Sequence, residues 1–127
     1  MDGDAARAYF LARPDAWLDF PFGPDVYVFK VGSKMFGTLS WEAELARINL
    51  KCEPTQAQML RDVFPAVLPG YHMNKTHWNT VLLDGSVPTG ELERMIDHSY
   101  AQVVAKLPRA ERLALEVKYG KNAVYAA

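Results

Sequence analysis

Cysteine is almost missing from this sequence, and so are the patterns by which metal centres and membrane proteins are recognised. Cys52 is the one cysteine in 127 residues, so an internal disulfide framework and a CxxC metal site are both excluded. No apolar run approaches the roughly 18 residues that a membrane-spanning helix needs, and no signal-peptide pattern is present. No glycine-rich loop precedes a predicted helix as a phosphate cradle would. We therefore expect a cytoplasmic protein without membrane association and without a cofactor.

An excess of charge of one sign is also lacking. The net charge is −1, half of the residues are hydrophobic and 23% are charged, which is typical of a soluble globular chain. This length is that of one domain, covering residues 1–127. Residues 29–80 hold six basic and four acidic side chains, so only the middle of the chain is mildly basic. Strong non-specific nucleic-acid binders show a clearer basic excess.

Apolar periodicity and turn signals predict the element order α-β-β-β-α-β-β-α. Strands are expected at 26–31, 35–41, 46–52, 71–75 and 77–83, and helices at 4–13 (N-cap Asp4), 54–64 and 90–107 (N-cap Thr89), with a short helix at 109–120. "DFPFGPD" (19–25) reads as an irregular bridge. Strands segregated from helices in this way predict an α+β two-layer sandwich, α-β(3)-α-β(2)-α, with an antiparallel sheet and helices covering one face. The other face is then open to water or to a partner.

Strand alternation identifies the side chains expected on that open face. In 46–52 the apolar residues share one side, so Arg47, Asn49 and Lys51 point outward. The expected outward set is Lys30, Phe36, Thr38, Ser40, Arg47, Asn49 and Lys51, joined by His77 and Asn79 if 77–83 turns the same way. No acid lies in this set, so lysines could meet phosphates while bases stack on Phe36. Any solvated sheet face must also be polar, and that interpretation stays open.

The segment "GYHMNKTHWNTVLLDG" (70–85) raises the question of metal binding or catalysis. His72 and His77 are five residues apart, which places them on opposite faces of a continuous strand, and no carboxylate lies in 70–83. These facts disfavour a shared metal. Cys52 ends an amphipathic strand on its apolar side, as a buried structural thiol does. No catalytic motif is present, so we expect a binding protein and not an enzyme.

Several blocks together resemble the MmcQ/YjbR family of small bacterial proteins. They are "DFPFGPDVYVFKVGSKMFGTL" (19–39), "RINLKCEP" (47–54), "PGYHMNKTHWNTVLLDG" (69–85), "MIDHSY" (95–100) and "VVAKLP" (103–108). The resemblance runs in order over about residues 5–112 and leaves 113–127 as a C-terminal extension. It implies a fold similar to secretion chaperones and CyaY-like proteins, and DNA binding through a double-wing arrangement of the sheet hairpins. It implies no catalytic residues.

Three functional hypotheses follow. The first is DNA binding through the open sheet face and the 70–79 loop, mostly by phosphate contacts. The candidate residues are Lys30, Lys34, Arg47, Asn49, Lys51, His72, Asn74, Lys75, His77 and Asn79. The second is a protein- or peptide-binding module that uses the same face, or a homodimer through it, so the chain is expected to be a monomer or a weak homodimer. The third is a small-molecule or catalytic site at His72 and His77.

Overall fold

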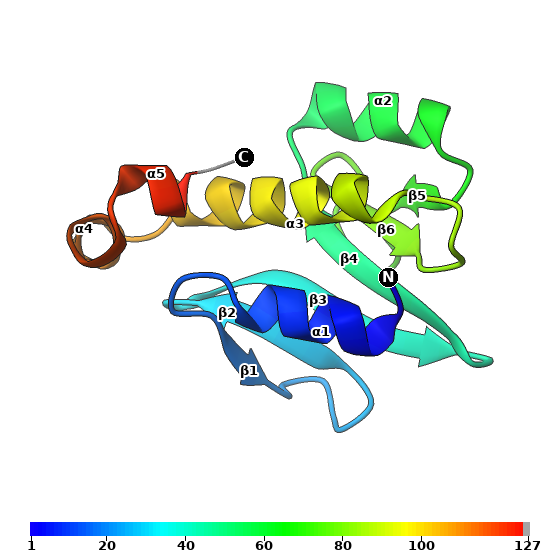
Figure 1. Ribbon diagram of the computed structural model, residues 1–127, viewed down its shortest axis with the longest axis horizontal. Helices are drawn as coiled ribbons and strands as arrows, with labels where there is room; N and C mark the ends of the chain where they lie inside the picture. Colours follow the sequence, from blue (N-terminus) through cyan, green and yellow to red (C-terminus); the bar gives the residue numbers. More distant parts are fainter. Residues whose placement is uncertain (126–127) are drawn as a thin grey trace.

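The computed structural model describes residues 1–125 and packs a layer of helices against one six-stranded sheet (Figure 1). The strands are β1 (Trp17–Asp19), β2 (Tyr27–Val31), β3 (Lys34–Glu42), β4 (Leu45–Lys51), β5 (Val67–Pro69) and β6 (Trp78–Leu82). The helices are α1 (Gly3–Leu11), α2 (Pro54–Val63), α3 (Thr89–Val104), α4 (Arg109–Tyr119) and α5 (Lys121–Val124). Every strand pair is antiparallel, in the order β1-β2-β3-β4-β6-β5. The predicted fold class is confirmed.

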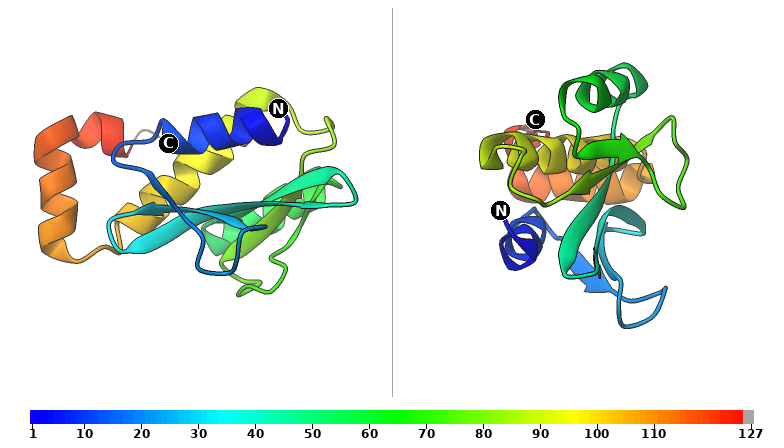
Figure 2. Two further views of the ribbon diagram at one scale, coloured as in Figure 1. Left: turned by 90° about the horizontal axis from the view of Figure 1, so that it is seen from below. Right: turned by 90° about the vertical axis from the view of Figure 1, so that its right-hand side faces the viewer.

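The hydrophobic core lies between the sheet and the two helices α1 and α3, which run over the same face (Figure 2). Phe10 of α1 stacks on Phe29 of β2, with ring centroids 4.2 Å apart. Phe36 of β3 meets Tyr100 of α3 edge to face at 5.2 Å. All four rings are buried, and aromatic burial of this kind supplies much of the driving force for folding. Within residues 1–125, no helix lies on the opposite face of the sheet.

Two strands differ from the prediction. Residues 17–19 form β1, which pairs with β2, whereas the sequence predicted no strand there. Residues 71–75 form a loop, and β5 at Val67–Pro69 takes the predicted place beside β6. The loop forms because His72 adopts a positive φ of 59°, and because Asn74 Oδ1 accepts the backbone N–H groups of Thr76 and His77. An asparagine that bonds its own backbone in this way competes with strand pairing.

The predicted outward position of Phe36 is wrong. A register shift between Phe29 and Lys30 pairs Phe29 with Gly37 but Lys30 with Met35, which leaves Phe36 as the extra residue of a bulge. A bulge reverses the alternation locally, and the Phe36 ring turns into the core. Gly37 is required beside it, since a Cβ atom there would lie 2.2 Å from Cε1 of Phe10.

The helix starts were also predicted imperfectly. The side chain of Asp2, not of Asp4, caps α1 by accepting the N–H of Ala5, and α3 follows Pro88 without a side-chain cap. The C-terminal extension holds most of α4, together with α5, at one end of the molecule (Figure 1), and its last two residues lie outside the described residues. Within residues 1–125, no helix has both the length and the apolar character that crossing a membrane requires.

Candidate binding cleft on the open face of the sheet

Two loops project from the sheet face that α1 and α3 leave open (Figure 2). One is the 20–26 loop between β1 and β2, and the other is the 70–77 loop between β5 and β6. Between them lies a cleft of about 520 Å³, hereafter the open-face cleft. Its lining residues are Phe22, Asp25, Val26, Thr38, Ser40, Trp41, Glu42, Arg47, Asn49, Tyr71, His72 and Met73. Pockets for small ligands commonly have this size.

A buried polar network crosses three neighbouring strands beside the cleft. Thr38, Asn49 and Thr80 lie side by side in register on β3, β4 and β6. The Asn49 Nδ2 group donates to Thr38 Oγ1 at 2.9 Å, and Thr80 Oγ1 donates to Asn49 Oδ1. Thr80 Oγ1 also accepts the backbone N–H of Tyr71 at 2.9 Å. The network therefore anchors the start of the 70–77 loop to the sheet.

Arg47 contributes a cation to the floor of the cleft. Its guanidinium forms an ion pair with Glu42 and lies 5.7 Å from the centre of the Tyr71 ring. Its Nε atom is buried and has no hydrogen-bond partner among the described residues. Most buried donors in proteins are paired. This unpaired donor is therefore an unusual feature of the site.

Exposed aromatic side chains border the cleft. Phe22 is 63% exposed and Tyr71 57%, and the rings of Tyr71 and His72 lie 4.0 Å apart. The ring of Trp41 is not among them: Trp41 pairs with Ala46, which faces the core, and its indole lies against Gly3 of α1 on the helical side. Large exposed aromatic groups gathered around one concavity are more informative than single exposed apolar residues elsewhere. They offer flat surfaces on which a planar or apolar ligand group can stack.

Two unpaired lysines lie at the ends of the strands that floor the cleft. Lys51 follows Asn49 by two residues on β4, on the same face, and Lys34 begins β3. Burial, and then the positive charges of Lys34 and Lys106, lower the pKa of Lys51. Neither Lys34 nor Lys51 has an acidic partner within residues 1–125. An anion placed beside Lys51 would favour its charged form.

The structure gathers only part of the predicted site. Arg47, Asn49 and His72 line the cleft, although Asn49 is buried, so its expected exposure was wrong. Asn79 is also a correction, because its side chain faces α2, donating to Ala57 O and accepting from Arg61. The strand that carries Asn79 turns Trp78 and Thr80 toward the open face instead.

The remaining predicted residues lie around the cleft or are already paired. Lys30 forms a 2.8 Å ion pair with Asp19, which removes it from the free cations. Lys75 donates to Gly70 O, and the exposed Asn74 and His77 belong to the turn of the 70–77 loop. Sequence reasoning missed Phe22 as a lining residue, and the prolines on both sides of it in "PFGP" were the available signal of an exposed loop.

The described part of the chain contains no set of side chains that could bind a metal ion. No group of three His, Cys, Asp or Glu side chains comes together there. The third histidine, His98, lies in α3 on the helical side, where its Nε2 accepts the N–H of Glu53. Cys52 is buried, and burial raises the pKa of its thiol to about 11, so it is predominantly protonated at neutral pH.

Residues 11–102 match the YjbR family model. The chain belongs to the YjbR family. It is 34% identical to YbdF of Escherichia coli O157:H7 over 109 residues, which is 86% of this chain and 89% of that protein. It is also 34% identical to YjbR of E. coli K12 over 107 residues, 84% and 91% of the two chains.

Solved structures of related chains share the fold. The crystal structure of Deinococcus radiodurans DR2400, a DUF419 domain, is 36% identical and has a TM-score of 0.82 over 90% of this chain and 87% of that one. A crystal structure from Pseudomonas syringae is 30% identical with a TM-score of 0.69, covering 78% and 96%. The YjbR-family match begins at the end of α1 and runs into α3, so it includes every residue that lines the open-face cleft.

Proposed function

We propose that this YjbR-family chain is a nucleic-acid-binding module that holds single-stranded DNA or RNA against its open sheet face. The observation that carries the proposal is the pair of exposed aromatic side chains, Phe22 and Tyr71, that two loops place at the open-face cleft. Lys51 and Lys34, at the ends of the same strands, have no acidic partner within residues 1–125. Proteins that bind single strands combine aromatic stacking surfaces with cations along the backbone path. One base would stack on Tyr71 or Phe22, and the phosphates would follow toward Lys51 and Lys34.

The form of the cleft favours a single strand over a duplex. A base can enter a concavity only when it is unstacked and unpaired, and in a duplex this costs a few kcal/mol. Below the rims the cleft offers the hydroxyl of Ser40 and the guanidinium of Arg47, which suit the polar edge of a base. Phosphate contacts would supply affinity without sequence preference. We therefore expect single strands to bind more tightly than the matching duplex.

The charge distribution predicts weak binding with a shallow salt dependence. Two lysines contacting phosphates of a single strand give a slope of log K against log salt of about −1.4, so raising salt from 50 to 200 mM weakens binding about 7-fold. Lys51→Gln should halve that slope, and the same salt change then costs about 3-fold. Lys121→Gln is the control of equal charge change, because Lys121 lies in α5 beside Glu116.

The test is a fluorescence-anisotropy titration of a labelled 12-nucleotide strand and its duplex at both salt concentrations. Tyr71→Ala should weaken single-strand binding about 5- to 150-fold, the cost of losing one stacked base, and Tyr71→Phe should bind nearly as the parent does. Absence of binding at 50 mM salt overturns the proposal. Binding that does not depend on salt would rule out the phosphate contacts. An equal loss of affinity in Tyr71→Ala and Tyr71→Phe would rule out stacking on Tyr71.

A second candidate is a peptide or protein partner at the same cleft. Asp25 favours it, because this exposed acid lines the cleft and has no cationic partner within residues 1–125. A basic peptide with an aromatic or aliphatic side chain would match both Asp25 and the rims. The variant Asp25→Asn separates the candidates. It should slightly strengthen the binding of nucleic acid and weaken the binding of a basic peptide. Light scattering shows whether a second copy is the partner.

A further inference from the structure

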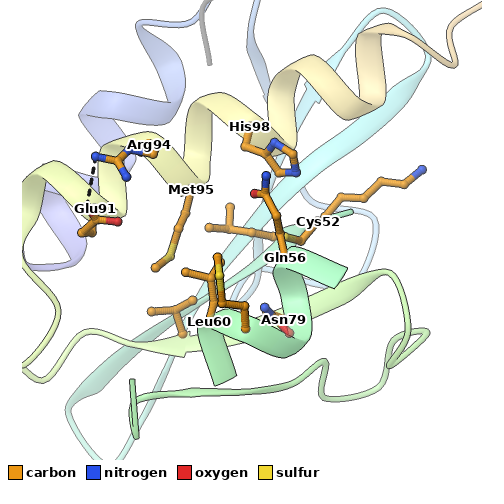
Figure 3. Close-up of a pocket in the computed structure, with 12 residues that line it drawn as sticks. Cys52, Gln56, Leu60, Asn79, Glu91, Arg94, Met95 and His98 are labelled. Atoms are coloured by element: carbon orange, nitrogen blue, oxygen red, sulfur yellow. Dashed lines mark ion pairs between the residues drawn. The ribbon is translucent and has the colours of Figure 1, made fainter. Parts of the chain in front are cut away.

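A second cavity of about 200 Å³ lies on the helical side of the sheet, between α2 and α3 (Figure 3). It shares no lining residue with the open-face cleft. Its walls are apolar where Leu50, Val81, Leu60 and Met95 meet, and polar where His98 and Gln56 lie together at one end. The Glu91–Arg94 ion pair lines the side away from His98, and Lys51 is a further lining residue. We call it the helix cavity.

The helix cavity exists because α2 does not pack tightly on α3. Ala57 is the one fully buried residue of α2, and Met59 is 54% exposed although it lines the cavity. Polar bonds to the sheet hold the helix instead: Asn79 Nδ2 donates to Ala57 O at 3.3 Å, and Arg61 donates to Asn79 Oδ1 at 3.1 Å. Apolar side chains of both helices therefore face a space that no other residue within 1–125 fills.

The polar end of the cavity presents an unpaired donor. Nε2 of His98 accepts the backbone N–H of Glu53 at 3.1 Å, so the neutral ring carries its hydrogen on Nδ1. Burial lowers the pKa of His98, which keeps the ring neutral at pH 7. Neither Nδ1 nor the side-chain amide of Gln56 has a hydrogen-bond partner among the described residues. Both groups are open to solvent, since Gln56 is exposed and neither is a buried unpaired atom, so an acceptor at this end would replace water as their partner.

We propose that the helix cavity binds a small, mostly apolar molecule that carries a carbonyl or carboxylate oxygen at one end. The oxygen accepts from His98 Nδ1 and the Gln56 amide, and the apolar body lies among Leu50, Leu60 and Met95. A dry cavity of about 150 Å³ holds benzene, with six non-hydrogen atoms, so this cavity holds about eight. Such a ligand has a Kd on the order of 1 mM.

The test uses three six-carbon probes: hexanoate, hexanamide and hexylammonium. Hexanoate and hexanamide carry the acceptor, whereas hexylammonium has the same chain and only donors. In ¹H–¹⁵N spectra of the full chain, the first two should shift the Gln56 side-chain amide and the backbone amides of Met95 and His98. Hexylammonium should bind at least 10-fold more weakly. Tighter binding of hexanoate than of hexanamide would identify the ligand as an acid, and the reverse as a neutral carbonyl compound.

Two variants locate the binding. Leu60→Trp fills the cavity from a half-buried position and should abolish the shifts. Gln56→Leu removes the exposed amide with little effect on folding, and it should weaken the binding of both acceptor probes several-fold. Gln58→Leu is the control, because Gln58 lies outside the cavity. No shift with either acceptor probe, equal binding of hexylammonium, or shifts that persist in Leu60→Trp would overturn the proposal. Lys51 lines the helix cavity and also lies on the proposed phosphate path, so Lys51 variants cannot separate the two sites. The Tyr71 variants can, because Tyr71 lines only the open-face cleft, and they should leave the probe-induced shifts unchanged.

Discussion

Replacing Thr80 by valine tests whether the buried network beside the open-face cleft stabilises both the fold and the 70–77 loop. Valine keeps the shape of threonine and removes one hydroxyl. That hydroxyl donates to Asn49 Oδ1 and accepts the N–H of Tyr71 at 2.9 Å. Both Asn49 and Thr80 are buried, at 9% and 1% exposure. Thr80→Val therefore leaves the Asn49 oxygen without its donor in a place that water reaches poorly.

The size of the destabilisation follows from the loss of these two hydrogen bonds. An unsatisfied buried acceptor costs about 1–3 kcal/mol, and the Tyr71 bond, which lies nearer the surface, adds about 1 kcal/mol. We expect the free energy of unfolding to fall by about 2–4 kcal/mol. For a chain of this length each kcal/mol corresponds to roughly 3–5 °C in Tm, so Tm should fall by about 6–20 °C. The amide of Tyr71 should also exchange with solvent faster than in the parent.

The assay is urea unfolding followed by circular dichroism, with hydrogen exchange read at Tyr71. Thr76→Val is the matched control, since Thr76 is exposed in the same loop, and it should change stability by less than about 0.5 kcal/mol. A double-mutant cycle with Asn49→Ala should give a coupling energy of about 1 kcal/mol or more. Equal effects of Thr80→Val and Thr76→Val, or an unchanged exchange rate at Tyr71, would refute the reasoning.

Two further predictions concern the core and the pH dependence. Gly37→Ala should destabilise the fold by about 1–3 kcal/mol in urea unfolding, because the new Cβ would meet Phe10 Cε1 at 2.2 Å, whereas Gly90→Ala, with no atom within 4 Å, should be neutral or stabilising. Burial, then the hydrogen bond to Asp97, raises the pKa of Tyr9 to about 12. Because the unfolded chain loses this proton first, Tyr9 makes stability fall as pH rises from about 10 to 12. Asp97→Asn should lower the pKa of Tyr9 without returning it to 10. The pKa is measured from the absorbance of tyrosinate at 295 nm, with Tyr9→Phe identifying the contribution of Tyr9. An unchanged pKa in Asp97→Asn would contradict this prediction.

Local patterns determined much of this fold. The β2–β3–β4 strands and the helices α2, α3 and α4 lie within a few residues of their predicted bounds, because side-chain periods of two and of about 3.6 residues are set by the backbone itself. The same alternation correctly placed Arg47, Asn49 and Lys51 on the open face. The burial of Cys52 was predicted correctly, because Cys52 lies on the apolar side of the predicted strand 46–52. These features need only the sequence within one element.

Tertiary contacts decided the rest. The bulge that buries Phe36 depends on the register between β2 and β3, and alternation read along one strand cannot show it. Asn49 is polar and outward, yet it is buried because Thr38 and Thr80 arrive from neighbouring strands and the 70–77 loop bonds to Thr80. Asn79 faces α2 because β6 pairs with β4 in one particular register. The open-face cleft and the helix cavity both lie between segments far apart in the sequence, so only the folded chain determines which side chains line them.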